Sequence, residues 1–175
     1  MELLRPNRGD RILDASAGTG LFAKAILERT QGKVELALID ISAGMLAVAQ
    51  MRLQKYPQVT ILEQDVHKTT FKTGTFSQVV SANSFHYYAD ANTVLQEFNR
   101  VLKKSGVLVI TDWSRNTVRF KLFNTFLKII DPAHGHIYST LEMTALLQKN
   151  GFVVEEHRQF SSGLWSLLSI RARKV

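Results

Sequence analysis

The chain has 175 residues, of which 45% are hydrophobic, and a formal net charge of +7. This length and composition predict a single globular domain over residues 1–175 and exclude a disordered chain. Cysteine is absent, which excludes disulfides, thiolate metal sites and thiol catalysis. No apolar run approaches the roughly 20 residues of a membrane-spanning helix, and the start carries no apolar signal segment, so we expect a cytoplasmic protein without a membrane span. The basic residues are dispersed without interleaved aromatic residues, which argues against nucleic-acid binding.

Apolar runs typical of buried strands alternate along the chain with amphipathic segments typical of helices. Strands are predicted at residues 11–15, 34–40, 59–65, 76–82, 106–113, 152–160 and 164–173. Helices are predicted at 19–29, after a cap at Ser42, from a cap at Asp90 to Ser105-Gly106, at 118–130, and from the capping box Ser139–Glu142 to Asn150-Gly151.

This alternation predicts an α/β fold, a Rossmann-like doubly wound sheet covered by helices on both faces. Only the three residues Ser161–Gly163 separate the last two predicted strands. A connection this short allows an antiparallel hairpin and excludes a parallel crossover. The predicted sheet is therefore mostly parallel, with one antiparallel strand in a C-terminal hairpin.

The segment Ile12–Gly20, with the sequence Ile-Leu-Asp-Ala-Ser-Ala-Gly-Thr-Gly, ends a predicted strand and begins a helix. Gly18 and Gly20 permit a tight turn and close approach of the backbone to a ligand. Open α/β sheets bind ligands beyond the carboxyl ends of their strands, so this turn predicts a nucleotide site. A tight strand–helix turn without a ligand would also explain a lone Gly-x-Gly.

Two carboxylates follow at the ends of the next predicted strands. Asp40 lies 20 residues after Gly20 and can accept hydrogen bonds from both hydroxyls of a ribose. Its carboxylate would also lie near the N-terminus of the helix that begins after Ser42, where the helix dipole favours negative charge, and the two roles are compatible. Asp65 can accept a hydrogen bond from an adenine amino group, or make only local turn hydrogen bonds.

A dinucleotide oxidoreductase is an alternative, because Gly18–Ala23 also fits the pattern Gly-x-Gly-x-x-Ala. We expect Asp14 inside the turn, where its carboxylate would repel a diphosphate. The same charge would attract a cationic ligand such as the ammonium and sulfonium groups of S-adenosylmethionine.

Several segments in order resemble the class I S-adenosylmethionine-dependent methyltransferases, in particular small-molecule enzymes of the methyltransferase type 11-like group. The resemblance extends from about Arg11 to the C-terminus, and Ser16 stands where the family usually has its first glycine. The matching segments are 13–20, 38–42, 64–66, 76–90, 98–106 and 146–152.

The resemblance implies S-adenosyl-L-methionine as cofactor and methyl transfer to a small apolar or aromatic acceptor. It also indicates which residues bind the cofactor. These are Asp14, Ser16, Gly18, Gly20, Asp40, Ile41, Asp65, Val66, Ser81 and Asn83. Family members usually carry N-terminal helices over the methionine end of the cofactor, and we expect this chain to lack that lid. A non-catalytic cofactor-binding or scaffold protein is therefore the alternative to an enzyme.

Methyl transfer needs a general base only where the acceptor must lose a proton, so no catalytic residue is obligatory. His86, after the fourth strand, is a weak candidate base, and an aromatic wall formed by Phe85–Tyr88 is the favoured interpretation. His134-Gly-His136 has no matching ligands elsewhere in the sequence, so no metal is predicted. We predict that residues 114–138 form the acceptor side of the pocket, and the apolar helix at 118–130 leaves a homodimer open.

Overall fold

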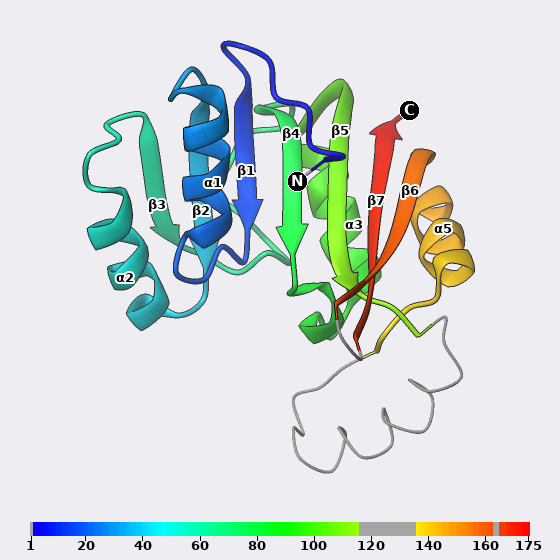
Figure 1. The fold of residues 1–175 in the computed structure, drawn as a ribbon. Helices are drawn as coiled ribbons and strands as arrows, with labels where there is room; N and C mark the ends of the chain where they lie inside the picture. The colour runs from blue at the N-terminus through cyan, green and yellow to red at the C-terminus, as the bar shows by residue number, and fades with distance from the viewer. Residues whose placement is uncertain (1, 116–135, 163–164) are drawn as a thin grey trace.

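The computed structural model describes residues 2–115, 136–162 and 165–175, which form a seven-stranded sheet with the order β3-β2-β1-β4-β5-β7-β6 (Figure 1). The strands are β1 (Arg11–Ala15), β2 (Glu35–Asp40), β3 (Val59–Glu63), β4 (Phe76–Ala82), β5 (Leu102–Trp113), β6 (Phe152–Ser162) and β7 (Trp165–Lys174). The helices are α1 (Leu21–Thr30), α2 (Ala43–Leu53), α3 (Ala91–Val101) and α5 (Thr140–Lys149), with a short 3-10 helix η1 (Phe85–Tyr87). The helix expected at 118–130 lies outside the described residues.

The strand directions confirm the predicted mixed sheet. Strands β1 to β5 pair in parallel, whereas β7 pairs antiparallel with both β5 and β6. The carboxyl ends of β1, β4 and β5 consequently lie at one edge of the sheet, the lower edge in Figure 1. The residues that follow each strand gather at this edge, which is where open α/β sheets bind their ligands.

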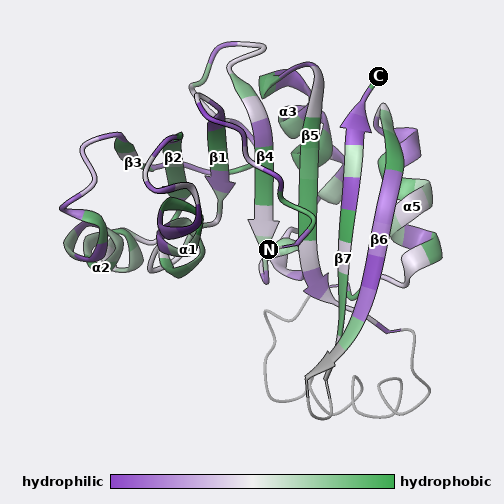
Figure 2. Ribbon diagram, turned by 45° about the horizontal axis from the view of Figure 1, so that its top comes forward, coloured by the Kyte–Doolittle hydropathy of each residue, from purple (hydrophilic) through white to green (hydrophobic). Residues whose placement is uncertain are grey.

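Two hydrophobic cores hold the layers together, one on each face of the sheet. Side chains of α1 and α2 pack on one face with Leu3 and Leu4, which are each 1% exposed. Side chains of α3 and α5 pack on the other face. Figure 2 shows the N-terminal segment crossing β4 and β5, both mostly hydrophobic. No helix of the described residues is long and apolar enough to cross a membrane.

The caps predicted at Ser42, Asp90 and Ser139 are confirmed, because each side chain accepts a backbone N–H of its helix. The predicted end of the third helix is wrong. Helix α3 ends at Val101, four residues before Ser105, and β5 begins at Leu102. Leu102 is fully buried and pairs with Phe76 of β4, so the chain leaves the helix in order to bury this side chain.

Candidate functional site

The structure brings the predicted cofactor residues together at the carboxyl edge of the sheet. Asp14 lies near the end of β1, Asp40 ends β2, and Asp65 lies two residues beyond β3. Asn83 follows β4 directly. Four separate strand ends therefore place these residues at one edge of the sheet, although they are far apart in the sequence.

The glycine turn lies between β1 and α1. The Ala17 N–H donates to the Ile39 carbonyl of β2, and the Gly20 N–H donates to the Ala17 carbonyl. Gly20 has φ of 72°, a left-handed conformation that favours glycine. A Cβ at this position would lie 3.1 Å from Ala49 Cβ. Gly20 is thus required both by the turn and by the close packing of α2.

The carboxylate of Asp40 is held by two backbone amides. Its Oδ2 accepts the Gly18 N–H at 2.8 Å, and its Oδ1 accepts the Ser42 N–H at 2.9 Å. Each carboxylate oxygen can accept more than one hydrogen bond, so both can still accept a hydroxyl of a ligand. The orientation of Asp40 is therefore set by the backbone of the glycine turn and of α2.

Asp14 belongs to strand β1, which corrects its expected place inside the turn. Its backbone pairs with Leu38 of β2 and Val80 of β4, and only 1% of the residue is exposed. Burial, and secondarily repulsion from Asp40, raise the pKa of Asp14 to about 7. Its Oδ2 has no hydrogen-bond partner among the described residues. A buried carboxylate oxygen without a partner fits a cationic ligand group, since such a group would satisfy it.

Asp65 lies beyond the third strand rather than inside it, because β3 ends at Glu63. Its Oδ1 accepts the His67 backbone N–H at 2.8 Å and lies 2.6 Å from His67 Nδ1. These two contacts with His67, the backbone contact first, hold the pKa of Asp65 below its usual value. Asp65 is exposed and charged, so it can accept a hydrogen bond from a base at the protein surface.

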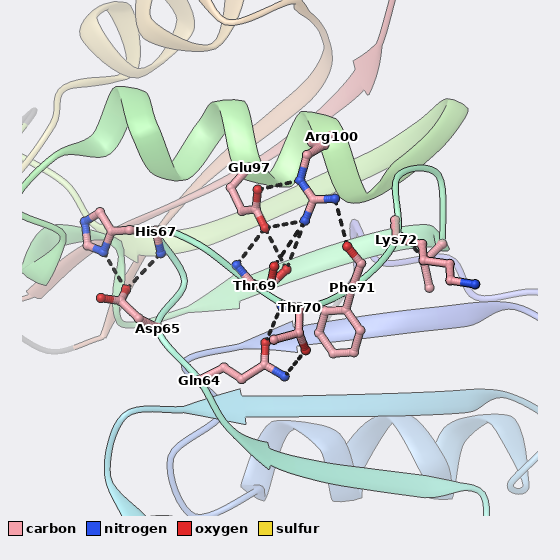
Figure 3. Close-up of polar contacts among 10 residues, drawn as sticks. Gln64, Asp65, His67, Thr69, Thr70, Phe71, Lys72, Glu97 and Arg100 are labelled. Atoms are coloured by element: carbon pink, nitrogen blue, oxygen red, sulfur yellow. Dashed lines mark hydrogen bonds and ion pairs between the residues drawn. The ribbon is translucent and has the colours of Figure 1, made fainter.

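The loop that carries Asp65 is fixed to helix α3 by a partly buried ion pair between Glu97 and Arg100 (Figure 3). Glu97 Oε1 accepts the Thr69 backbone N–H and hydroxyl at 2.8 and 2.6 Å. Arg100 donates to both oxygens of Glu97 and to the Phe71 carbonyl. Burial raises the pKa of Glu97, but the hydrogen bonds from Arg100 and Thr69 outweigh burial and hold this pKa below its usual range. Residues 69–71 are thereby attached to α3 without any ligand.

The three remaining predicted cofactor residues outside the serine cluster, Ile41, Val66 and Asn83, differ in their surroundings. Ile41 is 72% exposed and follows Asp40 directly, so it offers an apolar surface to a base. Val66 is 5% exposed and packs into the core. Asn83 is exposed and has φ of 55°, and its backbone N–H donates to the Thr111 carbonyl at 2.8 Å.

Ser16 and Ser81 belong to a cluster in which three serine hydroxyls surround the hydroxyl of Tyr88. The Tyr88 hydroxyl lies 3.0 Å from Ser16 Oγ, 3.1 Å from Ser81 Oγ and 3.4 Å from Ser84 Oγ. Ser16 has φ of 58°, a conformation that a non-glycine residue adopts at a cost of about 1 kcal/mol. The contact with Tyr88 offsets this strain and joins the glycine turn to the end of β4.

Sequence reasoning overlooked three residues. These are Tyr88, which contacts the glycine turn, Glu97 on α3, and Asp112 on β5. Asp112 lies near the end of β5, as Asp14 and Asp40 lie at or near the ends of their strands. The same strand-end pattern could have identified it. His86 is 3% exposed and its Nδ1 lies 2.6 Å from Asp112 Oδ1.

The expected absence of a metal site stays a prediction. Within residues 2–115, 136–162 and 165–175, no group of three or more histidine and acidic side chains is placed to hold a metal ion. Of the sequence His134-Gly-His136, His134 lies outside the described residues. His136 is exposed and its ring lies 4.5 Å from that of Tyr138.

Residues 12–106 match a family model described as a methyltransferase domain. The chain is 32% identical over 142 residues to the demethylmenaquinone methyltransferase of Thermotoga maritima, covering 79% of this chain and 60% of that protein. It is 31% identical over 117 residues to the ubiquinone/menaquinone biosynthesis C-methyltransferase of Coxiella burnetii, covering 65% of this chain and 47% of that protein. The chain thus spans about 60% of the length of the first curated relatives that it matches.

Solved structures share the fold. The YcgJ protein of Bacillus subtilis has a TM-score of 0.84 at 17% identity, covering 99% of this chain and 95% of that chain. A structure described as a SAM-dependent methyltransferase from Aquifex aeolicus has a TM-score of 0.77 at 22% identity, covering 99% of this chain and 86% of that chain.

Replacing Asp14 by asparagine is expected to stabilise the ligand-free protein at alkaline pH. The pKa of Asp14 is raised from 3.8 to about 7, so its stabilising effect is complete below pH 3.8 and is lost as the pH rises through 7. The amide of an asparagine cannot ionise. Guanidinium unfolding at pH 8 should show Asp14→Asn to be about 2–4 kcal/mol more stable than the wild type, at about 1.4 kcal/mol per pKa unit. At pH 4 this difference should be small. The assignment would be contradicted if the stability of the variant, relative to that of the wild type, were lower at pH 8 than at pH 4.

The Glu97–Arg100 pair is expected to matter for both stability and the Asp65 loop. Glu97→Gln removes the charge that Arg100 and Thr69 share, and should destabilise the protein by about 1–3 kcal/mol. It should also weaken binding of S-adenosylhomocysteine, measured by calorimetry. Glu28→Gln is the matched control, because Glu28 pairs with Lys24 on an exposed helix surface and should change stability by less than about 0.5 kcal/mol. Equal effects of the two substitutions would show that the Glu97–Arg100 pair has no special role.

Proposed function

This chain belongs to the class I S-adenosylmethionine-dependent methyltransferases, and on that premise we propose that it methylates a small aromatic acceptor of the hydroquinone class. The cofactor of the family is S-adenosylmethionine, which supplies a methyl group already activated by a sulfonium. The protein then contributes binding, alignment and electrostatics rather than the methyl chemistry itself.

The single observation that supports cofactor binding most strongly is the set of preoriented carboxylates at the sheet edge. Asp40 is fixed by the Gly18 and Ser42 amides, at the place where a ribose would lie. Asp14 offers a buried carboxylate oxygen to the cationic end of the ligand. Asp65 and the exposed Ile41 would flank the adenine. Ser81 and Asn83, at the end of β4, would lie beside the methionine portion.

The acceptor side is proposed from the aromatic residues that follow β4 and β5. Tyr87 is 49% exposed, and Trp113 stacks on His86 with ring centroids 5.1 Å apart. Tyr138 packs edge-on against Phe85 at 5.8 Å. Aromatic walls favour a flat aromatic acceptor over a sugar. The curated relatives support the same class, since they are named as a demethylmenaquinone methyltransferase and a ubiquinone/menaquinone biosynthesis C-methyltransferase.

The acceptor segment proposed at 114–138 is only partly within the described residues. Its two ends are described, and both lie near the aromatic residues. The Ser114 N–H donates to the Ser166 carbonyl, and Arg115 forms an ion pair with Glu142 of α5. The described ends of the segment therefore lie after β5 and before α5, which supports the proposal.

The cofactor assignment predicts a ranking of two aspartate substitutions. Asp40→Ala should weaken S-adenosylhomocysteine binding at least tenfold, because it removes acceptors for two hydroxyls at about 1.5–3 kcal/mol each. Asp65→Ala should have a smaller effect, since Asp65 would accept from one amino group. Calorimetry on both variants, with NAD as a ligand that should not bind, measures this. A reversed ranking, or tight NAD binding, would refute the placement of the nucleoside.

The acceptor class is tested by methyl transfer in vitro. We expect the chain, given S-adenosylmethionine, to methylate a water-soluble 1,4-dihydroxynaphthalene, with the new methyl group on a ring carbon. Mass spectrometry and carbon NMR of the product locate the methyl group. Catechols, amines and sugars serve as comparison acceptors. Preferential methylation of any of these would overturn the proposed class.

A further inference from the structure

His86 and Asp112 form a buried pair at the carboxyl edge of the sheet, on the acceptor side of the proposed cofactor site. His86 Nδ1 lies 2.6 Å from Asp112 Oδ1, and the His86 backbone N–H donates to Asp112 Oδ2 at 2.9 Å. Asp112 is 4% exposed. The pair links η1, which follows β4, to the end of β5.

The hydrogen bonds of Asp112 determine what its charge does. Its Oδ1 also accepts the Trp113 N–H at 2.7 Å. Two of these three contacts come from the backbone amides of His86 and Trp113, and the third is with the imidazole, so the backbone holds the carboxylate of Asp112 against Nδ1 of His86. A carboxylate beside Nδ1 keeps the proton of a neutral imidazole on that nitrogen, which makes Nε2 the basic atom of the ring.

Among the described residues, two aromatic rings lie against the imidazole of His86. The Trp113 ring stacks on the imidazole at an interplanar angle of 14°, and the half-exposed Tyr87 ring lies 4.0 Å from it. Only 3% of His86 is exposed, so water is largely kept from the imidazole. A flat acceptor that lies among these rings would approach the imidazole from an apolar side, where a proton transfer is not shared with solvent.

We infer that His86 is the general base of the reaction, that Asp112 is its positioning residue, and that the acceptor carries a weakly acidic ring hydroxyl. This inference rests on the proposed function and narrows it. An acceptor with an unprotonated nitrogen would need no base, whereas a hydroquinone must lose its hydroxyl proton before the ring carbon becomes a strong nucleophile.

In this step, Nε2 of His86 takes the hydroxyl proton, and the electron pair left on oxygen is delocalised to the neighbouring ring carbon. That carbon forms the bond to the methyl group while the carbon–sulfur bond breaks, which leaves neutral S-adenosylhomocysteine. The ring carbon then loses its own proton and the oxygen regains one, so that the ring is aromatic again. One proton is released overall, and Asp112 stabilises the imidazolium while it exists.

The alternative is that the pair only ties η1 to β5. The two roles differ in how the rate depends on the acidity of the acceptor. A general base matters little for a hydroxyl that is already ionised in solution and greatly for one that is not. A structural tie would affect both acceptors alike.

The test compares His86→Gln, Asp112→Asn and wild type in single-turnover methyl transfer with two dihydroxynaphthalenes. One has an ordinary hydroxyl acidity, and the other carries an electron-withdrawing group that ionises it at the assay pH. With the ordinary acceptor, His86→Gln should be about 10²–10⁴-fold slower than wild type, and Asp112→Asn should lie between the two. With the more acidic acceptor, both variants should recover most of the wild-type rate. His157→Gln, an exposed histidine on β6, is the control and should match wild type.

Two measurements without turnover accompany the rates. Affinity for S-adenosylhomocysteine should stay within about twofold in all variants, and proton NMR should show a downfield Nδ1 proton that disappears in His86→Gln and Asp112→Asn. Equal slowing with both acceptors, or a His86→Gln rate at least half that of wild type, overturns the base. If His86→Gln does not fold, Asp112→Asn decides by the same acceptor comparison. A wild type that binds S-adenosylhomocysteine but methylates neither acceptor overturns the proposed acceptor class and the base together.

Discussion

The two hydrogen bonds to the Asp40 carboxylate are the constraint on which the rest of the site depends. Through Gly18 and Ser42, one side chain at the end of β2 fixes the glycine turn after β1 and the start of α2. The same charge adds to the burial that raises the pKa of Asp14. Negative charge is therefore assembled before any ligand arrives, at a cost in stability that a cationic ligand can relieve. Under the proposed function, this cost would favour a sulfonium nucleoside over a diphosphate.

Part of the positive charge of the chain is explained by the fold and needs no charged partner. Lys33 precedes β2, Lys72 precedes β4 and Lys103 lies at the start of β5, all at the amino edge of the sheet. Helices α1 to α3 end at this edge, and their exposed carbonyls favour cations. Lys174 shows the effect directly, because its Nζ donates to the Asn99 and Leu102 carbonyls at the end of α3. The net charge of +7 is thus weak evidence for a polyanionic partner.

The sequence predicted the strands and caps well because each depends on local pattern. The apolar run 76–82 and the cap residues Ser42 and Asp90 needed no tertiary information. The end of α3 could not be predicted, since it depends on Leu102 reaching Phe76 across the sheet. The contacts of Glu97 with Thr69 and of Ser16 with Tyr88 join residues 28 and 72 positions apart. No spacing rule connects such residues, so only the fold reveals that they act together.

Four aspartates meet at one edge of this sheet, and their surroundings give each a different chemistry. Asp14 is a weak acid because it is buried, and its Oδ2 has no hydrogen-bond partner among the described residues. Two backbone amides make Asp40 a fixed acceptor, and contact with His67 keeps the exposed Asp65 charged. Asp112 is turned toward an imidazole. Strand ends supply only the positions; whether a carboxylate binds a cofactor or orients a base is decided by the donors that reach it. The same residue type can therefore have four different properties at one edge of the sheet, and the proposed function assigns three of these aspartates to the cofactor and Asp112 to the acceptor side.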